Sequence, residues 1–209
     1  MCGIAGQYCF DGRAPDRQLL ARMSEQLIHR GPDGVGTEVR GCMGLVHRRL
    51  AIIDLSDDGL QPMTNEDKTL WLLFNGEIYN YIELRDELVN KGHRFHSRSD
   101  TEVILHAYEE WGTGCLQRFN GMWAFALWDE RSQQLFCARD RFGIKPFYYT
   151  EIDGSFLFAS EIKALLRIES GRAVPPRSME VVPVQTGTET TLDEMERQAV
   201  IDALRQTRG

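Results

Sequence analysis

Met1-Cys2-Gly3-Ile4-Ala5-Gly6 opens the chain, and this stretch says more about fold and chemistry than any other of its length. Cysteine is small enough to permit removal of Met1, and Cys2 would then carry a thiol and a free α-amine on one Cα. The thiol has an ordinary pKa near 8.5 and the amine one of about 7.7–8.0, so the amine is partly neutral near neutral pH. We therefore expect Cys2 to be a nucleophile that holds its own base. From these residues alone, a structural cysteine near a start codon is the alternative.

Composition limits the class of protein. The 209 residues are 42% hydrophobic, enough for one large domain with a core. The formal net charge of −7 disfavours nucleic acid and anionic membranes as partners. No apolar run nears the roughly 18 residues of a membrane span, and no secretory signal is evident. The 5 cysteines are scattered without a C-x-x-C pair, which disfavours a zinc or disulfide framework and predicts the cytoplasm.

The order of strand and helix patterns predicts an α+β fold. Strands are expected over residues 3–10, 35–40, 43–53, 69–74, 122–128, 135–139, 147–150 and 156–159, and helices over 19–28, 79–90, 99–112 and 160–168. Ser99 and Glu102 have the spacing of a capping box at the third helix. Because the strands pair largely as hairpins, we expect a layered sandwich of mostly antiparallel sheets instead of a Rossmann repeat.

The composition and hydrophobic patterning of the chain change after Ile168. Residues 169–190 contain Pro175-Pro176 and no hydrophobic periodicity, so a linker is expected there. Thr191 and Glu194 then begin an expected amphipathic helix within residues 191–209. The predicted division is therefore a domain over 2–168, a linker and a C-terminal helix.

Five polar positions are candidates for a site around Cys2. Asn75-Gly76 offers a side-chain amide and a backbone N–H for one developing negative charge, although Asn-Gly more often forms a hairpin turn. Arg49 can form a bidentate pair with a carboxylate. Strand alternation should point it away from Arg48. The alternative is that Arg49 is a surface cation. Glu77 and Asp100 can hold an ammonium group, or can serve only to stabilise helix starts. These groups together fit a zwitterionic amino acid.

The 5 histidines show no metal-binding spacing. His93-x-x-His96 is too short a signal to indicate a site. We expect structural or surface roles for all of them and no metal.

Several ordered motifs resemble one family, the glutaminase domain of class II glutamine amidotransferases, in its asparagine synthetase branch. They are Cys2-Gly3-Ile4-Ala5-Gly6, His29-Arg30-Gly31-Pro32-Asp33, His47-Arg48-Arg49-Leu50-Ala51-Ile52-Ile53-Asp54, Gln61-Pro62-Met63, Phe74-Asn75-Gly76-Glu77-Ile78-Tyr79-Asn80, Ser99-Asp100-Thr101-Glu102, Gly121-Met122-Trp123-Ala124-Phe125-Ala126 and Ala138-Arg139-Asp140-Arg141-Phe142-Gly143-Ile144-Lys145-Pro146. The resemblance covers residues 2–168.

The resemblance implies a four-layer αββα N-terminal-nucleophile hydrolase fold with two antiparallel sheets. It implies hydrolysis of the glutamine side-chain amide to glutamate and ammonia through a thioester on Cys2. Asn75 and Gly76 would form the oxyanion hole. The substrate carboxylate would bind Arg49, its ammonium would bind Glu77 and Asp100, and the backbone at Ile52 and Ile53 would line the pocket. Residues 54–62 fall in the family's loop over bound glutamine.

The chain departs from asparagine synthetases after the first domain. The Ser-Gly-Gly-x-Asp-Ser type loop that binds ATP in the family's second domain is missing from this sequence. We therefore expect no cofactor in this chain, with ATP and Mg²⁺ confined to a synthetase domain or a separate synthetase subunit. The ammonia would go to an acceptor, which is aspartate in the family. A non-catalytic glutamine-binding remnant or regulatory module is the alternative function.

Overall fold

Two antiparallel sheets stack face to face in the computed structural model, which describes residues 1–52, 55–166, 177–178 and 199–203. The first sheet has the strand order β10-β8-β9-β1-β3-β2, and the second has the order β11-β7-β6-β5-β4. The strands of the first sheet are β1 (Gly3–Cys9), β2 (Gly34–Arg40), β3 (Met43–Arg49), β8 (Tyr148–Ile152), β9 (Ser155–Ala159) and β10 (Arg177–Ser178). Those of the second are β4 (Met63–Thr64), β5 (Leu70–Ile78), β6 (Gly121–Asp129), β7 (Gln134–Arg139) and β11 (Ala199–Ala203).

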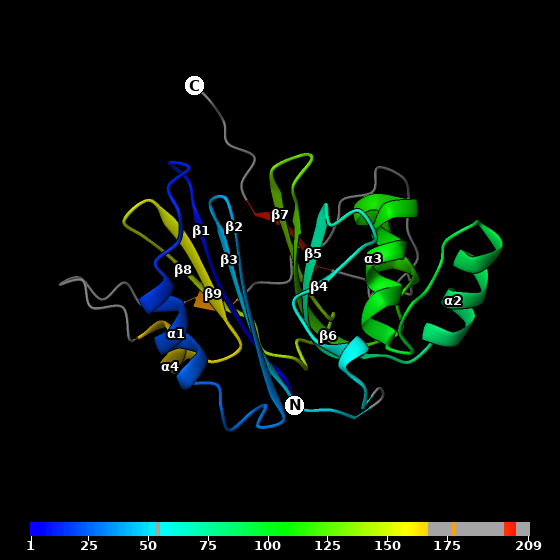
Figure 1. Cartoon of the computed structure of the whole chain (residues 1–209), viewed down its shortest axis with the longest axis horizontal. Coiled ribbons are helices and arrows are strands. Elements are labelled where there is room, and N and C mark those ends of the chain that lie inside the picture. Colours follow the sequence, from blue (N-terminus) through cyan, green and yellow to red (C-terminus); the bar gives the residue numbers. More distant parts are fainter. Residues whose placement is uncertain (53–54, 167–176, 179–198, 204–209) are drawn as a thin grey trace.

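Helices cover both outer faces of the sheet pair (Figure 1). The first sheet carries α1 (Arg17–Glu25) and the short α4 (Ile162–Leu165), and the second carries α2 (Tyr81–Asn90) and α3 (Asp100–Trp111). Two 3₁₀ turns, η1 (Asp57–Gly59) and η2 (Gly112–Arg118), complete the described elements. The expected αββα sandwich of two antiparallel sheets is confirmed. Within the described residues, no helix has the length and apolarity needed to cross a bilayer.

Alternation along the strands divides the core into three apolar layers. Even-numbered β1 residues such as Ile4 face the second sheet, where Leu73 and Trp128 meet them. Odd-numbered β1 residues such as Ala5 face α1 and Leu20. On the second sheet, Leu72 and its neighbours pack against α3. Strands buried on both faces explain why the sequence 122–128 is apolar throughout.

Some boundaries differ from the sequence-based expectation for identifiable reasons. The strand expected over 43–53 ends at Arg49, because the Ala51 N–H donates to the Asp33 carboxylate at 2.9 Å instead of to a neighbouring strand. Ser160 does not cap α4; its hydroxyl accepts the Ile4 N–H at 3.0 Å. Ser99 does cap α3, accepting the Thr101 N–H, yet Glu102 binds the backbone of residues 96 and 97 instead of closing a capping box.

The C-terminal expectation needs a correction where the structure describes it. Of the helix expected over 191–209, only Ala199–Ala203 lie among the described residues, and they form β11 instead of a helix. This strand pairs antiparallel with β7, whose outer backbone groups would otherwise form an open sheet edge. Arg177–Ser178, within the expected linker 169–190, pair with β8. The division at Ile168 stays a prediction.

Candidate active site

A cavity of about 180 Å³ opens where β1, β3 and β5 come together at one end of the two sheets. Its lining includes all the predicted site residues that the structure describes: Cys2, Arg49, Ile52, Asn75, Gly76, Glu77 and Asp100. Ile53 lies outside the described residues. Drug-sized ligands occupy pockets of roughly 300 Å³ or more, so this cavity suits a smaller molecule such as an amino acid. Residues far apart in the sequence thus meet in one site, as predicted.

Cys2 precedes β1, and its sulfur rests against the backbone of Leu50. The Leu50 N–H donates to the Cys2 Sγ at 3.4 Å, and the thiol lies 3.7 Å from the Leu50 carbonyl oxygen. Burial raises the pKa of the Cys2 thiol, and the Leu50 contact partly offsets this effect. The thiol is therefore mostly protonated at neutral pH, and a base is needed to activate it.

The motif His29-Arg30-Gly31-Pro32-Asp33 holds Cys2 and Leu50 in place. The Arg30 Nε donates to the Cys2 carbonyl oxygen at 2.9 Å. A side chain at Gly31 would lie 2.5 Å from the Arg49 backbone nitrogen, so only glycine permits this approach to β3. The Asp33 carboxylate holds the segment after β3 through Ala51, as described above. The sequence showed this motif without indicating its role.

Arg49 points between the two sheets, and Arg48 points away, as strand alternation predicted. The Arg48 Nε donates to the Ser24 hydroxyl on α1 at 2.9 Å. Arg49 is 8% exposed, lines the cavity and donates from Nη1 to the Ser56 carbonyl oxygen at 2.8 Å. A buried guanidinium at a cavity wall is a suitable partner for a carboxylate. The surface-cation alternative for Arg49 is therefore wrong.

Asn75-Gly76 is not a hairpin turn, because β5 continues through it to Ile78. Trp123 on β6 lies opposite Gly76. Its N–H donates to the Asp140 carboxylate and its carbonyl oxygen accepts the Asp140 N–H, so both of its backbone groups point away from β5. In an antiparallel ladder this arrangement turns the backbone N–H of Gly76 away from β6. Its neighbours two residues away follow the same pattern: the Phe74 N–H donates to the Gln61 Oε1 and the Ile78 N–H to the Asp100 Oδ2. Because these acceptors both line the cavity, the Gly76 N–H faces it between them.

The Asn75 side chain supplies a second donor. Asn75 is 1% exposed, and its Nδ2 has no hydrogen-bond partner among the described residues. A buried amide donor without an acceptor costs free energy, on the order of 1–3 kcal/mol, unless a ligand completes it. Asn75 thus brings an amide N–H without an acceptor to the cavity that Cys2 also lines.

Asp100 and Glu77 form an acidic wall of the cavity. Burial raises the pKa of Asp100 to about 6, the Ile78 N–H works against that rise, and the nearby Glu77 charge adds to it. The Ile78 N–H donates to the Asp100 Oδ2 at 2.9 Å. Glu77 lies on β5 itself, so its expected alternative as a helix-start residue is wrong, whereas Asp100 does begin α3. A cationic ligand would relieve the repulsion between the two carboxylates.

The family model for the glutamine amidotransferase domain matches residues 1–194. The chain belongs to the glutamine amidotransferase domain family. Its relatives include asparagine synthetase [glutamine-hydrolyzing] 3 of Bacillus subtilis, 46% identical over 169 residues, covering 79% of this chain and 27% of the relative. A putative asparagine synthetase [glutamine-hydrolyzing] 2 of Methanocaldococcus jannaschii is 40% identical over 187 residues, covering 81% of this chain and 36% of the relative. The chain thus spans about a quarter to a third of the length of these relatives.

Solved structures agree on the fold. Glutamine phosphoribosylpyrophosphate amidotransferase from B. subtilis matches with a TM-score of 0.65 at 23% identity, covering 78% of this chain and 43% of that one. A regulatory enzyme of purine biosynthesis matches with a TM-score of 0.66, also at 23% identity, over 78% of this chain and 43% of that chain. At this identity the likeness concerns the fold of the amidotransferase domain alone.

Lys145 is a cavity residue of the amidotransferase domain to which sequence reasoning gave no role. Asp140 places it: this carboxylate accepts the Lys145 N–H and the Trp123 N–H, and so folds the turn after β7 back onto β6. The Lys145 side chain is buried, and its Nζ contacts the Met1 sulfur at 3.2 Å. No carboxylate of the described part of the chain lies within ion-pair distance of it. Burial lowers the pKa of Lys145, and Arg30 adds to the effect.

Gln61 and Thr101 also line the cavity and were missed as site residues. The Gln61 Nε2 lies 3.4 Å from the Thr101 hydroxyl oxygen, which joins the segment before β4 to the first turn of α3. Because Gln61 also accepts from Phe74, it connects both walls of the cavity. The quoted Gln61-Pro62-Met63 motif was the available signal.

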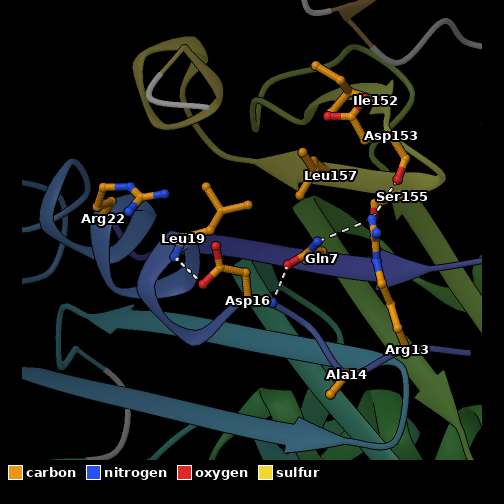
Figure 2. A pocket seen from close by; sticks show the side chains of 10 residues that line it. All are labelled: Gln7, Arg13, Ala14, Asp16, Leu19, Arg22, Ile152, Asp153, Ser155 and Leu157. Atoms are coloured by element: carbon orange, nitrogen blue, oxygen red, sulfur yellow. Dashed lines mark hydrogen bonds between the residues drawn. The ribbon is translucent and has the colours of Figure 1, made fainter. Parts of the chain in front are cut away.

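A larger cavity of about 410 Å³ lies on the outer face of the first sheet, beside α1 and the turn joining β8 and β9 (Figure 2). Its polar groups are largely occupied by one another. Gln7 donates to the Ser155 hydroxyl and accepts the Asp16 N–H, and Asp16 in turn caps α1. Among its lining residues there is no thiol. Chemistry instead of size therefore identifies the cavity at Cys2 as the candidate active site.

Proposed function

We propose that this domain hydrolyses the side-chain amide of glutamine to glutamate and ammonia. The observation that carries the proposal is the unpartnered Asn75 amide donor, buried in the same cavity as the Cys2 thiol and beside the Gly76 N–H. Two donors aimed at one point beside a nucleophile are what a tetrahedral oxyanion requires. The family membership and the glutamine-hydrolysing relatives support the same reaction.

In this proposal Met1 is removed, and the new α-amine of Cys2 takes the thiol proton, directly or through a water. The thiolate attacks the amide carbon of glutamine, forming a C–S bond, and the carbonyl oxygen becomes an oxyanion held by Asn75 and Gly76. The amine returns its proton to the leaving nitrogen, so ammonia departs and a γ-glutamyl thioester remains. The same amine then takes a proton from water, whose oxygen attacks the thioester carbon; the C–S bond breaks, the departing thiolate receives that proton from the amine, and glutamate is released.

The remaining cavity residues would orient the substrate. Arg49 would bind the α-carboxylate, and Glu77 with Asp100 would bind the α-ammonium group. Ile52 lines the cavity from the segment after β3, and Ile53 is proposed as a further substrate-binding residue on the family resemblance alone. An amino acid held at both charges presents its side-chain amide to Cys2 in one orientation, which is the positioning effect that accelerates such reactions.

The finer assignment is asparagine synthase (glutamine-hydrolysing). It rests on the relatives' names and on the share of their length that this chain spans. We propose that the ammonia passes to a synthetase domain or subunit that binds ATP and Mg²⁺, with aspartate as acceptor, and that this domain needs no cofactor of its own. All 5 cysteines are free, which favours a reducing compartment such as the cytoplasm.

A glutamine-mimicking diazoketone tests the proposal. It should alkylate the Cys2 sulfur with loss of N₂, giving one adduct by intact mass on protein that lacks Met1, and none on Cys2→Ala. Glutaminase turnover should disappear in Cys2→Ala and fall on the order of 100-fold or more in Asn75→Ala. Ordinary turnover by Cys2→Ala would refute the mechanism. Glutamine binding without turnover in the parent protein would instead support the non-catalytic module.

A further inference from the structure

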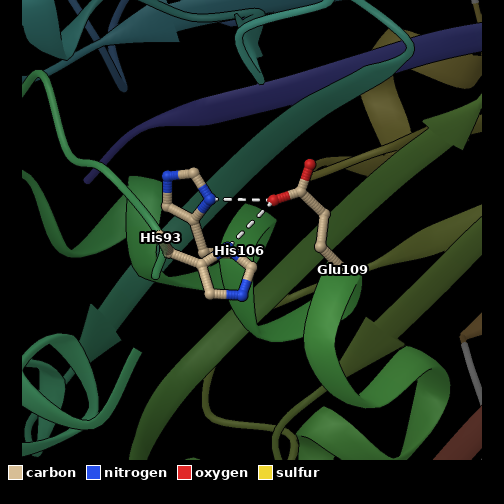
Figure 3. A group of neighbouring side chains, drawn as sticks. All are labelled: His93, His106 and Glu109. Carbon is tan, nitrogen blue, oxygen red and sulfur yellow. Dashed lines mark hydrogen bonds and ion pairs between the residues drawn. The ribbon is translucent and has the colours of Figure 1, made fainter. Parts of the chain in front are cut away.

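A second cluster of chemically active side chains lies on the helical layer over the second sheet. His93 follows α2, while His106 and Glu109 stand on one face of α3, three residues apart (Figure 3). One donor atom from each residue lies within 4.8 Å of those of the other two. The Glu109 Oε2 lies 2.8 Å from the His106 Nδ1 and 3.5 Å from the His93 Nδ1. None of the three lines the cavity at Cys2.

We propose that His93, His106 and Glu109 bind a divalent transition-metal ion, with Zn²⁺ the best match. Two imidazoles and one carboxylate are a ligand set that zinc takes in proteins, with a fourth position left for water. The proposal is independent of the glutaminase reaction, and it departs from the sequence-based expectation that the histidines hold no metal.

The outer atoms of His93 and Glu109 are already held by neighbouring groups. The His93 Nε2 lies 3.3 Å from the Glu110 Oε2, which leaves Nδ1 to face the cluster. The Glu109 Oε1 accepts the Asn65 amide at 2.8 Å, which leaves Oε2 facing the two rings. Metal ligands in proteins are oriented by such outer partners, most often carboxylates on the second imidazole nitrogen.

His106 is more buried, and its orientation is set by packing and by a nearby carboxylate instead of by a hydrogen bond on its outer nitrogen. Its side chain is 2% exposed, and its Nε2 points toward the Glu102 Oε1 at 3.7 Å, too long for a hydrogen bond. Phe95 packs edge-on against the ring with centroids 4.6 Å apart, which limits its rotation. The Nδ1 of His106 is thus aimed at the position that Glu109 and His93 also face.

The distances suit a metal after small side-chain movements. Zinc binds imidazole nitrogen and carboxylate oxygen at about 2.0–2.2 Å, so neighbouring ligand atoms of a tetrahedral site lie roughly 3.3–3.5 Å apart. The two separations from the Glu109 Oε2, 2.8 Å and 3.5 Å, bracket that range, and one ligand atom of each of the three residues lies within 4.8 Å of the other two. His93 and Glu109 are partly exposed, so an ion can reach the cluster from solvent. Among the described residues, the carboxylates of Glu102, Glu109 and Glu110 lie at the cluster. They outnumber Lys91, which pairs with Glu110, and Arg85, which stacks on the Phe95 ring, and this excess of negative charge favours a cation.

A bound ion would join the α2–α3 connection directly to α3 and, through the bond between Asn65 and Glu109, to the segment before β5. Asn65, held against Glu109, also accepts the Thr69 and Leu70 N–H groups at the start of β5. The metal would therefore fix the α2–α3 connection and α3 against the strand that leads to Asn75 and Gly76. Its expected role is structural support of the frame around the cavity.

Titration of chelator-treated protein with Zn²⁺ alone tests the inference, using calorimetry and thermal unfolding. To exclude the active-site thiol, every protein should carry Cys2→Ser. The parent should bind one equivalent and unfold at a higher temperature with Zn²⁺. His93→Gln and Glu109→Gln should each weaken binding at least 10-fold and lose most of that rise. His96→Gln, an exposed histidine of the same connection, is the matched control and should behave as the parent.

Three results would overturn the site. They are a parent that binds no stoichiometric Zn²⁺, an affinity unchanged by both His93→Gln and Glu109→Gln, and an equal loss in His96→Gln. The two substitutions lie on different segments, and far-UV circular dichroism of each shows whether it has folded. The first result needs no variant at all, so the inference stays falsifiable if either substitution disrupts folding.

Discussion

Replacing Asp100 with asparagine should stabilise the domain at neutral pH while weakening its binding of glutamine. Burial raises the pKa of Asp100 to about 6, compared with about 3.9 in an unfolded chain. The folded protein therefore holds this proton more tightly than the unfolded chain does. Stability contributed by Asp100 is highest at low pH and is lost as the pH rises from about 4 through 6.

The size of the effect on stability follows from the difference of about two units between the folded and unfolded pKa values of Asp100. At about 1.36 kcal/mol per unit, the charged carboxylate costs about 3 kcal/mol of stability at pH 7.5. The pKa of about 6 already includes the bond from the Ile78 N–H to the charged oxygen, and asparagine keeps an acceptor for that N–H. The net expectation is therefore that Asp100→Asn is about 3 kcal/mol more stable at pH 7.5 and close to the parent at pH 4.

Urea unfolding of both proteins at several pH values between 4 and 7.5 measures this difference. Comparing the two proteins at each pH cancels other titrating groups. One of these is His47, whose pKa burial lowers to about 3 and which therefore destabilises the fold as the pH falls from about 6.5. A stability difference that is the same at pH 4 and pH 7.5 would refute the electrostatic reasoning.

The same substitution that stabilises the fold should weaken the binding of glutamine. If Asp100 holds the substrate ammonium, glutamine should raise the unfolding temperature of the parent more than that of Asp100→Asn, and KM should increase in the variant. A variant with higher stability at pH 7.5 and an unchanged KM would confirm the buried charge but remove Asp100 from the substrate site. Such opposed effects on stability and activity are common where a functional charge is buried.

Two further predictions concern β5 and the turn after β7. Gly76→Ala should lower the free energy of unfolding in urea by about 1–3 kcal/mol or more, because its Cβ would lie 2.6 Å from the Trp123 Cα and force β5 and β6 apart. Gly114→Ala is the control: it has open space around it and should change stability by less than about 0.5 kcal/mol. Equal effects of the two substitutions would contradict the packing argument. Lys145→Met should raise the pKa of the Cys2 thiol, because a nearby cation favours the thiolate. The pH dependence of alkylation by iodoacetamide measures this change, Lys163→Met on the exposed side of α4 is the control, and an unaltered profile would show that Lys145 does not act on the thiol.

The fold class and the gathering of the site could be predicted because both depend on patterns within short segments. Strand alternation was enough to separate Arg48 from Arg49, and the apolar run at 122–128 indicated a strand buried on both faces. Asn75-Gly76 shows the limit of this reasoning. The dipeptide alone favours a turn, and only its pairing with β6 along the whole of β5 leaves it within a strand.

Other features depend on contacts that the sequence does not display. Lys145 reaches the cavity only because Asp140 accepts backbone donors from two segments. Glu102 sits at the capping-box position, yet the connection before α3 folds back and takes its carboxylate. Ala199–Ala203 pair with β7 because that strand has an open edge, a tertiary effect that overrides helical periodicity.

Three buried groups of the cavity at Cys2 depart from ordinary folding rules. They are an amide donor without an acceptor on Asn75, a buried ammonium without a carboxylate on Lys145, and the carboxylate of Asp100 held at a cost. A chain selected for stability alone would lose such groups, since each destabilises the free protein. In the proposed reaction, glutamine would offer an acceptor oxygen for the first and an ammonium group for the last, so its binding would satisfy groups that folding leaves incomplete. On that proposal, the residues that lower the stability of the free domain are the same ones that select its ligand.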